Sequence, residues 1–232
     1  MPSEEQGFTG PSEQWFDEEI FNQPKYKANF DEAGKHDYYF NSYSSHHIHE
    51  EMLKDAHRTE TYRNAIEGNK NQFKDKIVMD IGCGTGILSI FAARAGAKHV
   101  YAIDAAEIAL FAKEIVKDNG LQDKITVLHG KIEELDLPFK EGEVDIIISE
   151  WMGYFLLYES MLDCVLWARD KFLNKETGKM LPDRAKMYVS AIEDSQFMGE
   201  KITFWDNVYD VNMSCMTKGL FKDPIVDTVP AE

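Results

Sequence analysis

A glycine-rich turn, Asp80 to Gly86, connects an apolar segment at 76–81 to a segment of helical periodicity at 86–95. Glycine permits positive φ angles and lets a ligand approach the exposed backbone amides. The amide end of the following helix favours a negatively polarised ligand group. The sequence therefore predicts a strand, a turn and a helix built around a ligand.

The spacing of the glycines narrows the choice of ligand. Gly82, Gly84 and Gly86 are one residue short of the Gly-x-Gly-x-x-Gly pattern that accommodates a dinucleotide pyrophosphate. We therefore expect an adenosine ligand without a pyrophosphate. Asp104 ends the next apolar segment, where a carboxylate can accept hydrogen bonds from both ribose hydroxyls. The alternative is a turn that binds nothing, with Asp104 as a helix cap.

Strands and helices are expected to alternate along most of the chain. The expected strands are 76–81, 99–103, 124–128, 143–149 and 187–192, and the expected helices are 48–68, 86–95, 106–119 and 159–173, with partial helix at 202–205. Alternation of this kind is typical of an α/β protein whose parallel sheet is covered on both faces. The helical pattern at 48–68 is a candidate lid over the glycine turn.

Composition separates three regions and limits the class of protein. Residues 1–36 form an acidic leader with scattered Gly and Pro, residues 37–182 contain the alternating elements, and residues 183–232 are less regular.

A net charge of −16 opposes tight binding to nucleic acid and favours cationic partners, or simply keeps the protein soluble. Three scattered cysteines indicate neither a disulfide framework nor a zinc knuckle. With no membrane span or signal peptide evident, we expect a soluble intracellular protein.

Four acids follow successive expected strands: Asp80, Asp104, Glu133 and Glu150. Right-handed connections place the loops after parallel strands on one edge of the sheet, where ligands bind. Carboxylates there would repel the pyrophosphate of a nicotinamide dinucleotide but suit the positive sulfonium of S-adenosylmethionine. The acidic edge therefore disfavours a nicotinamide oxidoreductase. The carboxylate of such a donor needs a cation, and Arg58 is the best placed.

Glu150 and Glu159 flank a loop that contains Gly153 and several aromatic residues. Paired carboxylates often serve acid and base catalysis. Beside a methyl donor they could instead hold a guanidinium, so that one nitrogen keeps a lone pair aimed at the methyl group. The alternative for Glu159 is a simple helix N-terminal charge.

Two other groups of residues are weaker candidates for chemistry. The segment His49 to Leu53 lacks the second histidine of the His-Glu-x-x-His zinc motif, so no metal site is predicted near His46 and His47. Cys83 lies in the glycine turn without a histidine partner, and we interpret it as a small packing residue.

Taken together, these motifs resemble the protein arginine N-methyltransferase family, and most closely its predominant type I eukaryotic enzyme. The resemblance rests on Tyr39-Phe40-x-x-Tyr43, Ile48 to Asp55 with Arg58, Asp80 to Gly86, and Ser149 to Tyr154 with Glu159. It implies a class I, Rossmann-like methyltransferase domain at 37–182. It also implies that 183–232 is the start of a β-barrel domain with a dimerisation arm.

The resemblance also implies individual roles. Glu150 and Glu159 would be catalytic and hold the acceptor guanidinium, while Met52 would crowd the pocket so that both methyl groups reach one nitrogen. Tyr39, Phe40 and Tyr43 would close over the donor. The full set implied to bind S-adenosylmethionine, and its product S-adenosylhomocysteine, is Tyr39, Phe40, Tyr43, His49, Met52, Arg58, Asp80, Gly82, Gly84, Gly86, Asp104 and Glu133.

Partners and location are likewise implied by the resemblance. The acceptors would be histones and RNA-binding proteins with glycine and arginine repeats, and the product would be monomethyl and asymmetric dimethylarginine. Residues 205–215 would form the arm of a homodimer. The expected location is cytoplasm and nucleus, with no metal, no membrane and no direct nucleic acid contact.

The chain departs from the family pattern at three places. Asp104 replaces a glutamate, and His46 and His47 replace an aromatic residue and a glycine. Most of the family's C-terminal barrel is absent from these 232 residues. The alternative function is therefore a catalytically impaired regulator that binds the donor and dimerises with a complete methyltransferase.

Overall fold

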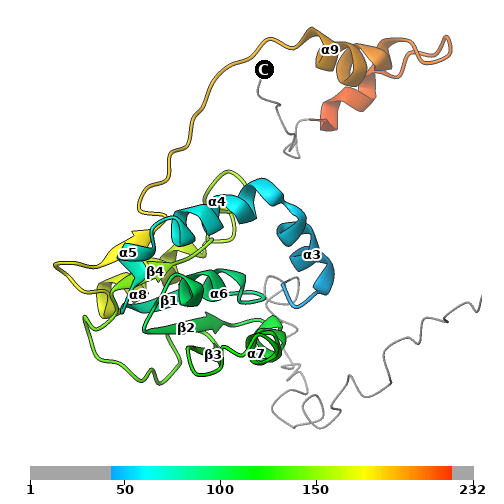
Figure 1. Cartoon of the computed structure of the whole chain (residues 1–232). Helices are drawn as coiled ribbons and strands as arrows, with labels where there is room; N and C mark the ends of the chain where they lie inside the picture. The colour runs from blue at the N-terminus through cyan, green and yellow to red at the C-terminus, as the bar shows by residue number, and fades with distance from the viewer. Residues whose placement is uncertain (1–42, 221–232) are drawn as a thin grey trace, which may run out of the picture. The chain divides into compact units, whose positions relative to one another are not determined.

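The computed structural model describes residues 43–220 (Figure 1). Its contacts divide these residues into two units, one up to Ala185 and one from Lys186, and each is described by itself. The predicted leader at 1–36 lies outside the described residues, as do Tyr39 and Phe40.

The first unit contains a five-stranded parallel sheet with the order β3-β2-β1-β4-β5. The strands are β1 (Ile77–Ile81), β2 (His99–Asp104), β3 (Ile125–His129), β4 (Ile146–Ile148) and β5 (Lys179–Leu181). The chain leaves β1 toward β2 and β3, and returns to the other side of β1 with β4. Ligands of such sheets bind where the strand order reverses, at the carboxyl ends of the strands.

Helices accompany the sheet, as Figure 1 shows. They are α3 (His46–Lys54), α4 (Ala56–Glu67), α5 (Lys70–Phe73), α6 (Ile87–Arg94), α7 (Ile108–Asp118) and α8 (Leu162–Phe172). Neighbouring residues of one strand join different apolar clusters: Val78 packs with residues of α4, α6 and α7, whereas Met79 packs with residues of α8. Because side chains alternate across a strand, this division confirms a sheet covered on both faces.

The helix expected over 48–68 is in fact two helices, which is a correction to the sequence analysis. Asp55 separates α3 from α4, because its carboxylate Oδ1 accepts a hydrogen bond from the Arg58 backbone N–H at 3.0 Å and so caps α4. The break places Arg58 in the first turn of α4. Neither α5 nor β5 was predicted, since each is only three or four residues long.

The second unit, from Lys186 to Leu220, contains short helical segments. These are α9 (Ser195–Phe197), η2 (Met198–Ile202), η3 (Thr203–Asp206) and η4 (Ser214–Gly219), which confirm the helical character expected at 202–205. The strand predicted at 187–192 is wrong, since these residues belong to no strand and Tyr188, Val189 and Ile192 are 82–84% exposed. An alternating pattern forms a strand only beside a neighbouring strand.

Between residues 43 and 220, none of the helices combines the length and apolar character needed to cross a membrane.

Candidate active site

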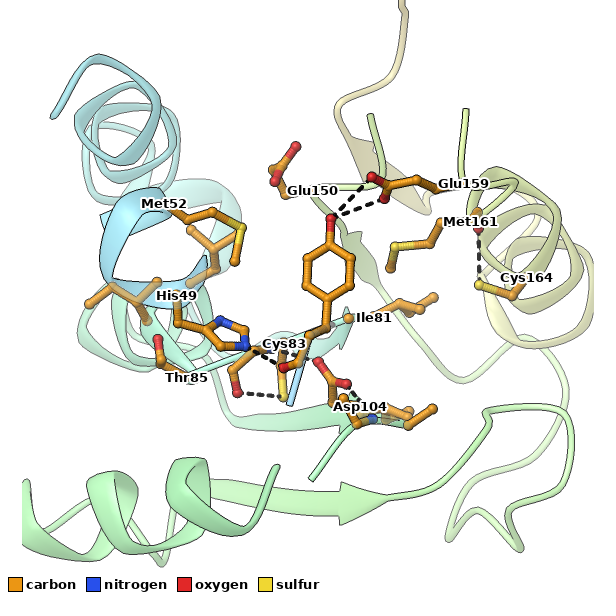
Figure 2. Close-up of a pocket in the computed structure, with 18 of the residues that line it drawn as sticks. His49, Met52, Ile81, Cys83, Thr85, Asp104, Glu150, Glu159, Met161 and Cys164 are labelled. Carbon is orange, nitrogen blue, oxygen red and sulfur yellow. Dashed lines mark hydrogen bonds between the residues drawn. The ribbon is translucent and has the colours of Figure 1, made fainter. Parts of the chain in front are cut away.

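A cavity of about 390 Å³ opens at the carboxyl ends of β1, β2 and β4 (Figure 2). The glycine turn, the end of β2, helices α3 and α4, and the loop between β4 and α8 all contribute to its wall. Of the predicted site residues within 43–220, those that line it are Tyr43, His49, Met52, Arg58, Gly82, Gly84, Asp104, Glu133, Glu150 and Glu159. The fold thus brings together residues that are more than 100 positions apart in sequence.

The glycine turn has the backbone conformation that the sequence predicted. Gly82, Gly84 and Gly86 have φ angles of 70°, 53° and 80°. A Cβ atom on Gly84 would stand 3.2 Å from Cε1 of His49, and one on Gly82 would stand 2.2 Å from Cε of Met161. The positive φ angles favour glycine at these two positions, and a Cβ atom on Gly84 would also require a small shift of the His49 ring.

Asp104 links the end of β2 to the glycine turn. Its Oδ2 accepts a hydrogen bond from the Gly84 N–H and its Oδ1 one from the Ala106 N–H, both at 2.8 Å. Burial raises the pKa of this carboxyl, and the two amide hydrogen bonds partly oppose that shift. Asp104 does not cap α7, whose N-cap residue is Glu107; it ties the end of β2 to the glycine turn and lines the cavity.

Asp80 lies beneath the turn and does not line the cavity. Its Oδ2 accepts a hydrogen bond from the Ser89 hydroxyl at 2.7 Å, which ties β1 to α6. Its Oδ1 is buried without a hydrogen-bond partner among residues 43–220. Gly86, which precedes α6, also lies outside the cavity wall. Asp80 therefore stabilises the turn rather than facing the cavity.

We expect Asp80→Asn to stabilise the protein increasingly as the pH rises. Burial raises the pKa of Asp80 from 3.8 to about 7. The folded state therefore holds this proton where the unfolded state has lost it, so the contribution of Asp80 to stability is fully present below about pH 4 and is lost as the pH rises to about 7. Asparagine stays neutral, so the stability of the variant relative to the parent should grow by about 2 to 3 kcal/mol between roughly pH 5 and 8.

Denaturant unfolding at several pH values measures this change. Asp118→Asn, at an exposed position at the end of α7, is the matched control, and its stability relative to the parent should change little with pH. If the difference in the free energy of unfolding between Asp80→Asn and the parent stayed constant over this pH range, the expectation would be contradicted.

The two glutamates lie at one end of the cavity, and Asp104 lies at the other (Figure 2). Glu159 Oε1 and Oε2 accept from the Tyr43 hydroxyl at 3.2 and 3.1 Å. The Tyr43 carbonyl oxygen is 2.7 Å from Nε2 of His49, whose ring stands next to Gly84. Burial, and then the charge of Glu159, raise the pKa of the Tyr43 hydroxyl, which keeps it protonated as a donor.

Glu150 pairs with Arg58, a contact that the sequence did not predict. Arg58 Nε donates to Glu150 Oε2 at 3.0 Å, and Nη2 donates to the same oxygen. Arg58 Nη1 donates to the Met52 carbonyl oxygen at 3.2 Å. Burial raises the pKa of Glu150, while Arg58 opposes the shift. The cation predicted for the donor and the carboxylate predicted for the acceptor are thus in direct contact.

Tyr62 and Met161 also line the cavity and were missed in the sequence analysis. The Tyr62 hydroxyl donates to the Ser149 carbonyl oxygen at 3.3 Å, immediately before Glu150. Tyr62 lies four residues after Arg58 on α4, so helical spacing could have placed both on one face. Met161 follows Glu159 by two residues, and only the fold brings it over Gly82.

His46 and His47 contact neighbouring side chains, and Cys83 is buried. The His46 ring packs edge-on against Phe111, and His47 contacts Glu51 at 3.4 Å. No group of three potential metal-binding side chains occurs between Tyr43 and Leu220. Burial raises the pKa of the Cys83 thiol, which disfavours the thiolate that a nucleophile needs.

Two family descriptions match separate parts of the chain. Residues 57–157 match "Ribosomal protein L11 methyltransferase (PrmA)", and residues 183–232 match "Arginine methyltransferase oligomerization subdomain". The first covers β1 to β4 and most of the loop between Glu150 and Glu159, and the second covers the C-terminal unit. The fold is thus a Rossmann-like methyltransferase domain followed by an oligomerization subdomain.

Several arginine methyltransferases are similar over most of the chain. "Protein arginine N-methyltransferase 1.1" of Arabidopsis thaliana is 59% identical over 199 residues, which are 86% of this chain and 50% of the relative. The Chlamydomonas reinhardtii "Protein arginine N-methyltransferase 1" is 59% identical over 193 residues, 83% of this chain and 55% of the relative. The chain therefore spans about half the length of the curated relatives it matches.

Solved structures agree with this relationship. "Trypanosoma brucei PRMT1 enzyme-prozyme heterotetrameric complex with AdoHcy" matches with a TM-score of 0.73 and 55% identity over 81% of this chain and 58% of that one. "Crystal structure of PRMT6-SAH" matches with a TM-score of 0.63 and 33% identity over 77% of this chain and 58% of that one. The glycine turn, the paired glutamates and these similarities lead to one conclusion: the chain belongs to the protein arginine N-methyltransferase family.

Proposed function

We propose that this protein transfers a methyl group from S-adenosylmethionine to a guanidinium nitrogen of arginine in other proteins. The observation that carries the proposal is that one cavity contains both the glycine turn with Asp104 and the pair Glu150 and Glu159. A methyl donor bound at the glycine-turn end of the cavity and an arginine bound at the glutamate end would bring their reacting groups together in the middle of the cavity. Positioning of two reactants in one site is a major source of rate enhancement.

The donor end of the cavity suits an adenosine with an amino acid tail. Gly84 lines the cavity and has no side chain, so a ligand could approach the backbone of the turn there. Asp104 would accept from the ribose, because a carboxylate oxygen that already accepts one hydrogen bond can accept another. Glu133 would lie near the adenine, and Arg58 would hold the donor carboxylate. Two related structures are titled with the demethylated product, AdoHcy or SAH.

The acceptor end suits a guanidinium. An arginine side chain stays protonated in water and is a poor nucleophile. Glu150 and Glu159 would hold its positive charge through hydrogen bonds to two nitrogens, and leave the third with a lone pair directed at the methyl group. The nitrogen would form a bond to the methyl carbon as the carbon–sulfur bond of the donor breaks, and the proton released from the methylated nitrogen would pass to a carboxylate of the pair or to water. Met52 would crowd the pocket and direct a second methyl to the same nitrogen, giving asymmetric dimethylarginine.

Acceptors and assembly follow from the same proposal. A net charge of −16 favours cationic segments, such as the glycine and arginine repeats of RNA-binding proteins and the tails of histones. The match of 183–232 to an oligomerization subdomain supports a homodimer through residues 205–215. We place the protein in the cytoplasm and nucleus, where such acceptors occur.

A second candidate is a donor-binding regulator that associates with a complete methyltransferase. It is favoured by the same C-terminal match, together with a related structure titled as an enzyme–prozyme complex. Both candidates predict donor binding, but only the first predicts a methylated product.

Calorimetric titration with S-adenosylmethionine, followed by mass analysis of a glycine and arginine-rich peptide, separates the two functions. Binding of S-adenosylmethionine together with formation of dimethylated peptide supports the methyltransferase function. Binding without product, even after long incubation, supports the regulator. A chain that binds no donor would contradict both.

A further inference from the structure

Ser149, the residue immediately before Glu150, is bound by three different elements of the fold. Its N–H donates to the Leu181 carbonyl oxygen of β5 at 3.0 Å, and its hydroxyl donates to the Ile81 carbonyl oxygen of β1 at 2.8 Å. Its own carbonyl oxygen accepts from the Tyr62 hydroxyl of α4 at 3.3 Å. Ser149 is only 1% exposed, so water has little access to these bonds. Every polar group of Ser149 therefore has a partner within the chain.

The residue after Glu150 is held as well. The Trp151 side chain is 7% exposed and packs in the apolar cluster that contains residues of α8. Glu150 thus leaves the sheet between two residues that the fold holds in place. Its backbone has little freedom to move, and the direction of its carboxylate depends on the position of these two neighbours.

Tyr62 contributes to this arrangement through a single atom. Its ring packs against the apolar cluster that contains residues of α6, and its hydroxyl reaches the end of β4. Burial, and then the charge of Glu150, raise the pKa of this hydroxyl, which keeps it protonated as a donor. A hydroxyl has one proton to donate, and this one is donated to the Ser149 carbonyl oxygen. The hydroxyl therefore holds the backbone before Glu150 without occupying its carboxylate.

We propose that Tyr62 and Ser149 are positioning residues for methyl transfer, because their hydroxyls hold the end of β4 so that the Glu150 carboxylate is directed at the acceptor guanidinium. This inference rests on the proposed function, since it takes the role of Glu150 from there. A carboxylate held in place before the acceptor arrives needs no rearrangement during the reaction, and a small displacement of such a group lowers the rate steeply. Neither hydroxyl has to touch the donor or the acceptor.

Tyr62→Phe tests this inference because it removes only the hydroxyl and leaves the ring to pack. We expect single-turnover transfer to a glycine and arginine-rich peptide to fall about tenfold, while the affinity for S-adenosylhomocysteine, measured by calorimetry, stays within about twofold of the parent. Tyr101→Phe is the matched control, since Tyr101 is a half-buried tyrosine of β2 that does not line the cavity. It should transfer methyl at the rate of the parent.

A second variant, Glu150→Asp, separates positioning from general destabilisation. It keeps the carboxylate but shortens the side chain by one methylene group, so the carboxylate no longer reaches the position at which Ser149 directs it. Tyr62→Phe added to Glu150→Asp should therefore lower transfer by less than about threefold further, since residues that act through one another are not additive. Ser149→Ala should follow the same pattern. The affinity of the peptide in saturating S-adenosylhomocysteine gives the same comparison without relying on the rate of Glu150→Asp.

The outcomes distinguish this inference from the function on which it rests. Transfer by Tyr62→Phe within about twofold of the parent would overturn the inference alone. A loss of equal size in the parent and in Glu150→Asp, or a parallel loss of S-adenosylhomocysteine affinity, would do the same, because either would show a general effect on the fold. A parent protein that binds S-adenosylhomocysteine but never methylates the peptide would overturn the proposed function itself.

Discussion

Glu159→Gln is expected to lower methyl transfer by about a thousandfold while donor affinity stays within about twofold of the parent. The substitution replaces a carboxylate with a neutral amide of the same size, which removes half of the negative charge that would hold the guanidinium. Loss of one partner from a partly buried ion pair costs about 4 kcal/mol, which corresponds to a factor of about a thousand in rate. Single-turnover transfer to a peptide, measured together with calorimetry of the donor, would show both effects.

The fold should tolerate this substitution. The Tyr43 hydroxyl that donates to Glu159 can donate equally to the carbonyl oxygen of a glutamine. Glu176→Gln, at an exposed position before β5, is the matched control and should transfer methyl at the rate of the parent. If Glu159→Gln also transferred within a few-fold of the parent rate, Glu159 would have no part in holding the acceptor.

Gly84→Val is expected to weaken donor binding by at least about a hundredfold. Gly84 has a φ of 53°, and a branched side chain rarely adopts such an angle. The added Cβ would stand 3.2 Å from the His49 ring, and the remaining atoms of valine would extend from the turn against which the donor is proposed to lie. Calorimetric titration with S-adenosylmethionine measures the loss.

Gly120→Val separates the local effect from general destabilisation. Gly120 follows α7 with a φ of 67°, and a Cβ there would meet no atom within 4 Å. Both variants therefore have similar backbone strain, and both should show a lower melting temperature. Only Gly84→Val should lose the donor, and unchanged donor affinity in that variant would place the donor elsewhere.

The sequence determined the sheet because its strands are continuous apolar runs with clear ends. β1 to β4 lie within three residues of their predicted limits, and the turn after β1 has the positive φ angles that its glycines indicated. The pairing of these strands also follows local rules, since short right-handed connections leave few possible orders.

Short or unpaired segments could not be predicted in this way. β5 has three residues and forms only because β4 lies beside it. Residues 187–192 have the alternation of a strand but no strand partner, so the pattern alone was misleading. The break between α3 and α4 depends on one carboxylate, Asp55, that turns back to the Arg58 amide.

The sequence also indicated which residues gather at the cavity, because the ends of parallel strands share one edge of the sheet. It could not indicate which of them touch. Arg58 and Glu150 are in contact although they are 92 positions apart in sequence. The Asp80 side chain lies below the glycine turn, where it accepts a hydrogen bond from Ser89 and does not line the cavity. Periodicity and glycine spacing act locally along the chain, and so they determine elements and their order. The partner of a charged side chain depends on distances and burial that exist only once those elements have packed, and so the tertiary structure alone decided that Glu150 pairs with Arg58.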